Sequence, residues 1–128
     1  MTDCPFCQRI AAGDVTDAHA HAVAVADGYP VAAGHTLVVP RRHVASMFDL
    51  GAEEYAAVWE VVSAVRRRLT AEGCRAFTIG VNDGAAAGQT VGHAHVHVIP
   101  RRAGDVGDPR GGVRWVLPER AAYWEGER

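Results

Sequence analysis

The sequence has no long apolar run, no basic and apolar leader and no excess of positive charge. A membrane helix needs roughly 20 consecutive apolar residues, so we do not expect this chain to be a membrane protein. The start, MTDCPFCQRIAAGD, lacks the pattern of a secretory signal, which favours the cytoplasm. Thirteen basic and fifteen acidic residues give a net charge of −2, which offers no general attraction for nucleic acid. Any phosphate binding must therefore be local.

Cysteines are also few, and an odd number, three, is atypical of a disulfide framework. Cys4 and Cys7 have the two-residue spacing with which two thiolates reach one metal ion. A thioredoxin-like redox pair is disfavoured, because these cysteines precede the first predicted strand. The sequence has no second CxxC motif, so a metal site would need two ligands from elsewhere. Two reduced, buried cysteines are the alternative.

The length of 128 residues and the hydrophobic content of 48% are those of one compact domain, which we expect to span residues 1–128. The clearest element is a helix over residues 52–72, where apolar residues recur at three- and four-residue spacing. Asp49 is its candidate cap and Gly73 its stop. The other predicted elements are a short helix at 5–12 and strands at 21–26, 35–39, 76–81, within 91–99, and at 113–117. Together they predict an α+β fold, with an antiparallel sheet of about five strands packed against one long helix.

Three histidines, His93, His95 and His97, alternate in the β-branched stretch HAHVHVI. Because successive side chains of a strand point to opposite faces, the histidines share one face and the small apolar residues between them face the core. Imidazoles can donate, accept, bind metal or attack as nucleophiles near neutral pH. Two alternatives remain at this point, a wet face with incidental histidines and a catalytic metal site with an open position.

The preceding loop, NDGAAAGQT, favours a third interpretation. It combines flexible glycine backbone with the amide and hydroxyl donors of Asn82, Gln89 and Thr90. The loop has no lysine, so it is not a P-loop. An uncharged anion cradle beside a neutral nitrogen nucleophile is an arrangement for phosphoryl transfer.

Several motifs together resemble one protein family. HAHVHVI resembles the His-x-His-x-His signature, and CPFCQRIAAGD, GHTLVVPRRHV, NDGAAAGQTV and PRRAGD extend the similarity over most of the chain. On these motifs the sequence is identified as a member of the histidine triad (HIT) family. The resemblance implies a homodimer in which each subunit contributes an antiparallel sheet, with a purine nucleotide bound near the triad.

The resemblance also implies a nucleotide hydrolase or nucleotidyl transferase acting on a purine nucleoside 5′-phosphoryl bond. His95 would attack the α-phosphorus, and water would then release the nucleoside monophosphate from the covalent nucleotidyl-histidine. His97 would contact the phosphate or its bridging atom, and preorganised donors of the loop would stabilise developing charge. Asp27 would hold the ribose, although a solvated turn aspartate is the plain alternative. The implied catalytic residues are His95, His97, Gln89 and Thr90, and the implied substrate-binding residues are Asp27, Asn82, Gly88, Gln89, Thr90 and His97.

Zinc-bearing members of the family use the N-terminal cysteine pair with two histidines, which correspond here to His43 and His93. The implied Cys4, Cys7, His43, His93 site would be closed and structural. Of the remaining candidates, His35 is expected to be structural or near the site. His19 and His21 are expected on a surface strand, and Cys74 in the core.

The motifs do not choose between two branches. GQTV and PRRAGD resemble the fragile-histidine-triad branch, whose members split dinucleoside polyphosphates. The cysteine pair and the PRRH turn resemble zinc-bearing bacterial members and the purine phosphoramidase branch. Arg101, Arg102 and Arg110 would contact distal phosphates or form a solvated basic face. The rival function is a nucleotide-binding sensor or partner-binding dimer with slow turnover.

Overall fold

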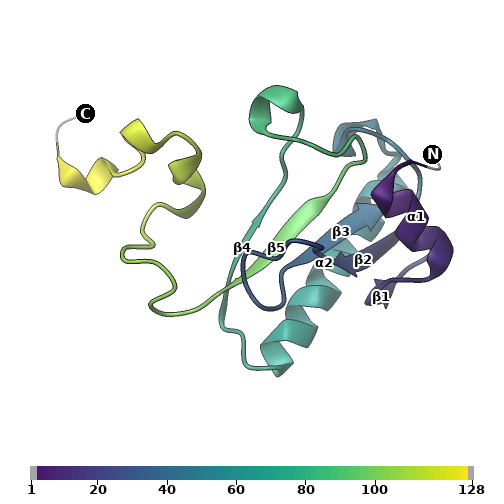
Figure 1. Cartoon of the computed structure of the whole chain (residues 1–128), viewed down its shortest axis with the longest axis horizontal. Helices are drawn as coiled ribbons and strands as arrows, with labels where there is room; N and C mark the ends of the chain where they lie inside the picture. The colour runs from purple at the N-terminus through teal and green to yellow at the C-terminus, as the bar shows by residue number, and fades with distance from the viewer. Residues whose placement is uncertain (1–2, 127–128) are drawn as a thin grey trace.

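A long helix covers one face of an antiparallel sheet, and a short N-terminal helix covers part of the other (Figure 1). The computed structural model describes residues 3–126. No helix within those residues is long and apolar enough to cross a membrane. The helices are α1 (Pro5–Ala12) and α2 (Ala52–Ala71), and the strands are β1 (Asp17–Ala18), β2 (Ala22–Ala26), β3 (Thr36–Pro40), β4 (Ala76–Gly80) and β5 (Val96–Arg101). The predicted α+β fold is confirmed.

The sheet has the strand order β1-β2-β3-β5-β4, and every pair is antiparallel. This order places β5, which carries the last triad histidine, in the interior of the sheet. His97 lies opposite Leu37 on β3 and Gly80 on β4. The site is therefore built on a strand that both neighbours support, and β4 forms one edge.

Helix α2 begins later than its predicted cap. Asp49 ends a short 3-10 turn, and Gly51 occupies the N-cap position. The Glu54 carboxylate accepts the Gly51 N–H at 3.0 Å and binds Arg42 at 2.9 Å, so a side chain from inside the helix replaces the predicted cap. The buried stripe of α2, which includes Val58, Val65 and Leu69, packs on the sheet as the periodicity predicts.

The short helix α1 has the predicted bounds. Cys4 is its N-cap and its first residue is a proline, which has no amide hydrogen to leave unpaired. Gly13 ends it in the left-handed conformation with φ 72°. Phe6 is buried between α1 and the sheet, against a cluster that includes Val25 and Val39. This packing closes the N-terminal segment over the face that carries the histidines.

Two predicted strands differ from the structure. The histidine strand starts at Val96, because the preceding segment pairs with the turn after β3, where the Ala94 N–H donates to the Val44 carbonyl at 2.7 Å. The predicted strand at 113–117 is wrong, since Gly112–Val116 is a 3-10 helix. Gly111 and Gly112 have positive φ values of 92° and 45°, so the chain turns away from the sheet edge there. The C-terminal segment extends away from the sheet (Figure 1).

Candidate active site

The three alternating histidines lie in a row, and their face is covered. The His95 and His97 ring centroids are 5.2 Å apart. The Phe6 ring lies edge-on to His95 and His93, at 5.1 and 5.8 Å. His93 is 0% exposed and His95 7% exposed, so the wet-face alternative does not describe these two residues. The chemistry of the row is therefore that of imidazoles in a largely dry environment.

The backbone fixes the tautomer of His95. Its Nδ1 lies 2.8 Å from the His93 carbonyl oxygen, which can only accept a hydrogen bond. Nδ1 must therefore carry the hydrogen and donate it. In the neutral ring this leaves a lone pair on Nε2. The neutral form of His95 is thus a nitrogen nucleophile with one defined attacking atom, Nε2.

A chain of hydrogen bonds fixes His97 in the opposite tautomer. The Val31 N–H donates to His35 Nδ1 at 3.2 Å, so the neutral His35 ring carries its hydrogen on Nε2. That nitrogen lies 3.0 Å from His97 Nδ1 and 3.3 Å from an Asp27 carboxylate oxygen. By donating to His97 Nδ1, His35 leaves the His97 hydrogen on Nε2. The site therefore presents an acceptor nitrogen on His95 beside a donor nitrogen on His97.

Burial favours the neutral forms of His35 and His97. Burial lowers the pKa of His35, and the Asp27 carboxylate acts in the opposite direction. The pKa of His97 is also lowered, first by burial and then by the neighbouring His95 and His35 rings, again against Asp27. A negatively charged group bound beside His97 would add to the effect of Asp27 and favour a proton on the pair.

Asp27 is not a solvated turn residue. Its side chain is 15% exposed. One carboxylate oxygen accepts the Tyr29 N–H at 2.7 Å, which closes the turn after β2, and the other faces His35. The carboxylate therefore lies beside the histidine row, where it contacts His35 and is still exposed enough to contact a ligand.

The glycine-bearing loop leads into the histidine row, and Gln89 braces it. The Gln89 amide oxygen accepts the Gly84 N–H at 2.9 Å. Its amide nitrogen donates to the carbonyls of Ala45 at 2.8 Å and Val91 at 3.0 Å. Gln89 thus donates both amide hydrogens to backbone carbonyls, which is not the arrangement expected of a side chain that donates hydrogen bonds to a phosphate. Gly88 has φ 94°, Thr90 is exposed and Asn82 is half-buried.

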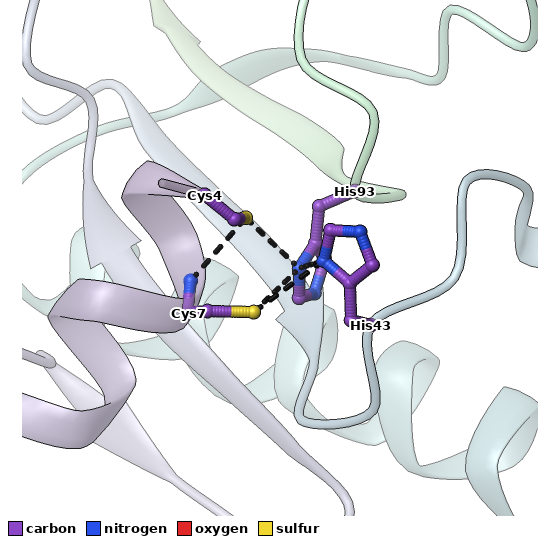
Figure 2. A group of neighbouring side chains, drawn as sticks. All are labelled: Cys4, Cys7, His43 and His93. Atoms are coloured by element: carbon purple, nitrogen blue, oxygen red, sulfur yellow. Dashed lines mark hydrogen bonds between the residues drawn. The ribbon is translucent and has the colours of Figure 1, made fainter. Parts of the chain in front are cut away.

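The four predicted metal ligands converge from three parts of the chain (Figure 2). Cys4 Sγ and Cys7 Sγ lie 3.5 and 3.6 Å from His93 Nδ1. His43 Nδ1 lies 3.4 Å from Cys7 Sγ and 3.2 Å from His93 Nδ1. Ligands bound tetrahedrally at zinc–sulfur and zinc–nitrogen distances lie roughly 3.3–3.8 Å apart. The group thus has the spacing of a metal site.

The chemistry of these residues also fits a metal ion. His93 Nε2 donates to the Pro40 carbonyl at 2.8 Å, which leaves the Nδ1 lone pair directed at the cysteines. The pKa of the Cys7 thiol is raised, first by burial and then by Cys4. Two adjacent thiolates are therefore unfavourable alone, whereas a divalent cation would stabilise both. A second group, Asp27, His35 and His97, also has its ligand atoms within 4.8 Å, and the hydrogen bonds described above account for it.

Comparison with known proteins identifies the family. The HIT domain model matches residues 11–104, a range that includes His43 and the whole triad. The chain belongs to the HIT domain family. The match does not include the cysteine pair or the C-terminal segment.

Three similar proteins illustrate the relationship. A nitrilase and fragile histidine triad fusion protein of Caenorhabditis elegans is 46% identical over 80 residues, 62% of this chain and 18% of that protein. A bifunctional bis(5′-adenosyl)-triphosphatase/adenylylsulfatase of Arabidopsis thaliana is 40% identical over 77 residues, 59% of this chain and 43% of that protein. The chain spans less than half the length of either. The crystal structure of a HIT family protein from Bacillus anthracis superposes with a TM-score of 0.71 at 35% identity, covering 77% of this chain and 73% of that one.

Other candidate residues of this HIT domain fall outside the histidine row. Arg101 binds Asp105 at 2.8 Å, and Arg110 binds Asp108 at 2.9 Å, so neither forms an unpaired basic face. Cys74 lies in the core, as predicted. His19 and His21 lie in the turn between β1 and β2 instead of on a strand, and they contact Glu60 and Glu53 of α2.

His35 is the residue whose role the sequence predicts least completely. It was expected near the site, and the structure adds that it directs the tautomer of His97. The only sequence signal is its position directly before a β-branched strand that ends in the PRRH turn. That signal cannot reveal the Val31 N–H, which comes from a loop of irregular geometry.

Proposed function

We propose that this protein is a nucleotide hydrolase that cleaves a purine nucleoside 5′-phosphoryl bond, a phosphoramidate or a phosphoanhydride, and releases the nucleoside monophosphate. The observation that carries the proposal is the pair of opposite tautomers, an acceptor Nε2 on His95 beside a donor Nε2 on His97. The name of the Arabidopsis relative, a bis(5′-adenosyl)-triphosphatase, supports the same class of reaction. Because the chain matches only part of that relative, the substrate itself is part of the proposal.

The reaction proceeds in two displacements. His95 Nε2 attacks the α-phosphorus, so a nitrogen–phosphorus bond forms while the bond to the leaving atom breaks. The bound phosphate favours uptake of one proton by the His35–His97 pair. His97 Nε2–H therefore hydrogen-bonds to the leaving atom and passes its proton to it, which leaves the pair neutral. Water then attacks the same phosphorus and frees His95. The oxygen of that water and one of its hydrogens stay on the phosphate, and the other hydrogen returns to His97 Nε2.

The substrate lies between Asp27 and the glycine-bearing loop. Asp27 retains one partly exposed carboxylate beside the histidine row, which supports its assignment to the ribose hydroxyls. Gly88, Thr90 and Asn82 supply backbone and side-chain donors to the phosphate and nucleoside. The bonds that Gln89 makes with the loop assign it first to positioning these donors. It reaches the phosphate only if those bonds open.

The Cys4, Cys7, His43 and His93 group binds structural zinc in this proposal. The spacing of the four ligand atoms and the free lone pair of His93 Nδ1 support it. When bound, zinc supplies a closed Cys2His2 cross-link and no chemistry of its own. That cross-link joins α1 to the segment that carries His95.

The proposal includes a homodimer that functions in the cytoplasm. Each subunit contributes its antiparallel sheet, and β4 is an edge strand available for pairing with a second copy. The other proposed partner is the purine nucleotide, and nucleic acid is not proposed, because the net charge of −2 gives no general attraction for it.

Steady-state AMP release from an adenosine 5′-phosphoramidate and from a diadenosine polyphosphate tests the function. We expect the native protein to release AMP from at least one, and His95→Ala to lose at least about a thousandfold in kcat while still binding AMP. His19→Ala, which replaces a histidine outside the row, is the matched control and should keep native turnover. Nucleotide binding without cleavage of either substrate would contradict the hydrolase proposal and favour the nucleotide-binding sensor instead.

A further inference from the structure

The two cysteines of the proposed zinc site lie close together at the start of α1 and differ in exposure. Cys4 is the N-cap of the helix and is 8% exposed, and its sulfur accepts the Cys7 N–H at 3.5 Å. Cys7 is half-buried. The two sulfurs lie 3.5 and 3.6 Å from the same atom, His93 Nδ1, and within 4.8 Å of each other (Figure 2). Solvent therefore reaches one sulfur of a close pair.

The cysteine pair can also form a bond with itself. Side chains three residues apart on a helix have Cβ atoms about 5–6 Å apart. A disulfide needs Cβ atoms about 3.5–4.5 Å apart and sulfurs at about 2.05 Å. Cys4 still has extended backbone, with φ −79° and ψ 120°, so rotation of the two side chains and a small shift at the helix start close the gap. The same backbone thus permits two states, a metal-bound pair of thiolates and a disulfide.

The two histidines of the group have hydrogen bonds that do not need the metal. His93 Nε2 donates to the Pro40 carbonyl, so His93 Nδ1 is an acceptor. His43 Nδ1 lies 3.2 Å from that acceptor and can donate to it when it carries the hydrogen. The buried Nδ1 of His93 is therefore paired even without a metal ion, which lowers the cost of releasing one.

Oxidation of the cysteine pair and zinc binding exclude each other. Zinc binds cysteines as thiolates, and the thiolate is also the form that reacts with peroxide. A disulfide has no thiolate, so only His43 and His93 remain of the four ligands. Two imidazoles alone do not form a closed tetrahedral site. A zinc ion held by this group must therefore leave when the disulfide forms.

Release of the ion would act on the histidine row through His93 and Phe6. The His93 carbonyl accepts the Nδ1 hydrogen of His95 at 2.8 Å, and the His93 ring is the proposed metal ligand. Phe6 lies between the two cysteines in sequence, and its ring contacts both histidine rings. A shift at the start of α1 therefore moves the groups that orient the nucleophile.

We propose that Cys4 and Cys7 are a peroxide-sensitive modification site whose oxidation to a disulfide releases zinc and loosens α1 from the histidine row. This inference goes beyond the proposed function and rests on its zinc site. The Cys7 thiolate attacks one oxygen of hydrogen peroxide, which gives a Cys7 sulfenic acid and hydroxide. The Cys4 thiolate then attacks the Cys7 sulfur, so the sulfur–sulfur bond forms and a second hydroxide leaves. Both hydroxides take up a proton and become water, the two thiolates lose two electrons in all, and zinc leaves as a divalent cation.

The test treats the zinc-loaded native protein with micromolar hydrogen peroxide and measures released zinc, free thiols and peptide masses. We expect about one zinc ion for each Cys4–Cys7 disulfide. Cys74 should remain a thiol, because it lies in the core under α2, on the other face of the sheet. Cys74→Ser is the matched control and should release zinc as the native protein does.

Two further measurements test the effect on the histidine row. Amide hydrogen exchange in residues 5–12 should become faster on oxidation, because α1 loses its cross-link. The kcat for AMP release should fall roughly 10- to 100-fold, since the groups that orient His95 are displaced. Dithiothreitol with added zinc should restore the native value of both.

The contrary results have different meanings. Sulfinic or sulfonic acid on Cys7 without the disulfide, a disulfide with zinc still bound, or earlier oxidation of Cys74 would overturn the modification site. A disulfide in a protein that holds no zinc beforehand would overturn it together with the zinc site. Zinc release with unchanged exchange in α1 would overturn the link to the histidine row. Absence of AMP release by the reduced, zinc-loaded protein would contradict the hydrolase function, whereas zinc release and faster exchange on oxidation would still support the modification site.

Discussion

At the residue scale, backbone groups fix the tautomers of the two reactive histidines, His95 and His97. The His93 carbonyl holds the hydrogen of His95 on Nδ1, and the Val31 N–H acts on His97 through His35. Peptide groups do not titrate or exchange donor for acceptor as side chains do. The nucleophile and the donor are therefore defined before any substrate binds, which is the preorganisation that makes such groups effective.

His35→Phe tests whether His35 positions His97. The ring volume is kept, but the hydrogen bond to His97 Nδ1 is lost, so both tautomers of His97 become populated. We expect kcat to fall roughly 10- to 100-fold, with little change in KM. His35→Gln, whose amide can still donate, should recover part of kcat. An equal fall in kcat for both variants, or a change confined to KM, would contradict the positioning role.

Stability should fall in mild acid because His35 and His97 are buried. Their pKa values lie below the ordinary 6.5 in the folded chain, so the unfolded chain takes up their protons first as the pH falls. The free energy of unfolding is therefore undiminished above about pH 6.5 and decreases as the pH falls toward the folded pKa values. Urea unfolding at about pH 7.5 and pH 5.5 measures this loss, which should be smaller in His35→Phe. An equal loss in both proteins would contradict the assignment.

Among the elements, α1 and the segment before β5 form one unit. They meet at the Cys4, Cys7, His43 and His93 group and at Phe6, which contacts both His93 and His95. The proposed zinc ion would thus hold α1 over the histidine row. This explains why an element without catalytic side chains packs against the site.

Metal analysis of the purified protein tests the zinc site. We expect about one zinc per chain, lost in Cys7→Ser and kept in Cys74→Ser, which changes the buried cysteine outside the group. Chelation should lower the melting temperature together with activity, because the ion is structural. Loss of activity without loss of stability would instead indicate a catalytic metal on the triad.

The packing of α1 is tested by Phe6→Ala. Phe6 is 6% exposed, and removal of a buried phenylalanine ring costs about 3–5 kcal/mol of unfolding free energy. Phe48→Ala is the matched control, since Phe48 is 72% exposed and should change stability by less than about 0.5 kcal/mol. Chemical denaturation measures both. Equal losses in the two variants would show that α1 does not close the site as described.

The elements predicted well are those with a strong local signal. The periodic stripe predicts α2 nearly to its ends, and Pro5 and Gly13 predict the bounds of α1. The predicted start of β5 and the predicted strand at 113–117 were both wrong, and for the same reason. Whether a β-branched stretch joins a sheet depends on a partner distant in sequence, and at 113–117 two glycines turn the chain away from the sheet edge.

For the whole molecule, the proposed homodimer gives the most direct prediction. Each chain has a mass of 13.6 kDa, so sedimentation at micromolar concentration should give twice that mass. The edge strand β4 and the exposed apolar side chains of the C-terminal segment, Val113, Val116 and Leu117, would account for such an association. A monomer under these conditions would contradict it. That residues 1–128 form a single domain stays a prediction, since the family match covers 11–104.

The sequence predicted which residues gather at the site better than what each one contacts. The alternation of the triad and the CxxC spacing bring the metal group and the histidine row together as expected. The bonds of Gln89 within its own loop, and the Val31–His35–His97 chain, could not be predicted. They depend on loop backbone geometry, for which the sequence carries no periodic signal.

The central claim is the covalent intermediate on His95, and direct trapping tests it. The native protein is mixed with an adenosine 5′-phosphoramidate, quenched within one turnover, and its intact mass and peptides are measured. We expect the gain of one adenylyl group on His95, absent in His95→Ala and present in His19→Ala. Rapid AMP release with no adenylyl group on the protein, or with the group on another residue, would contradict the account.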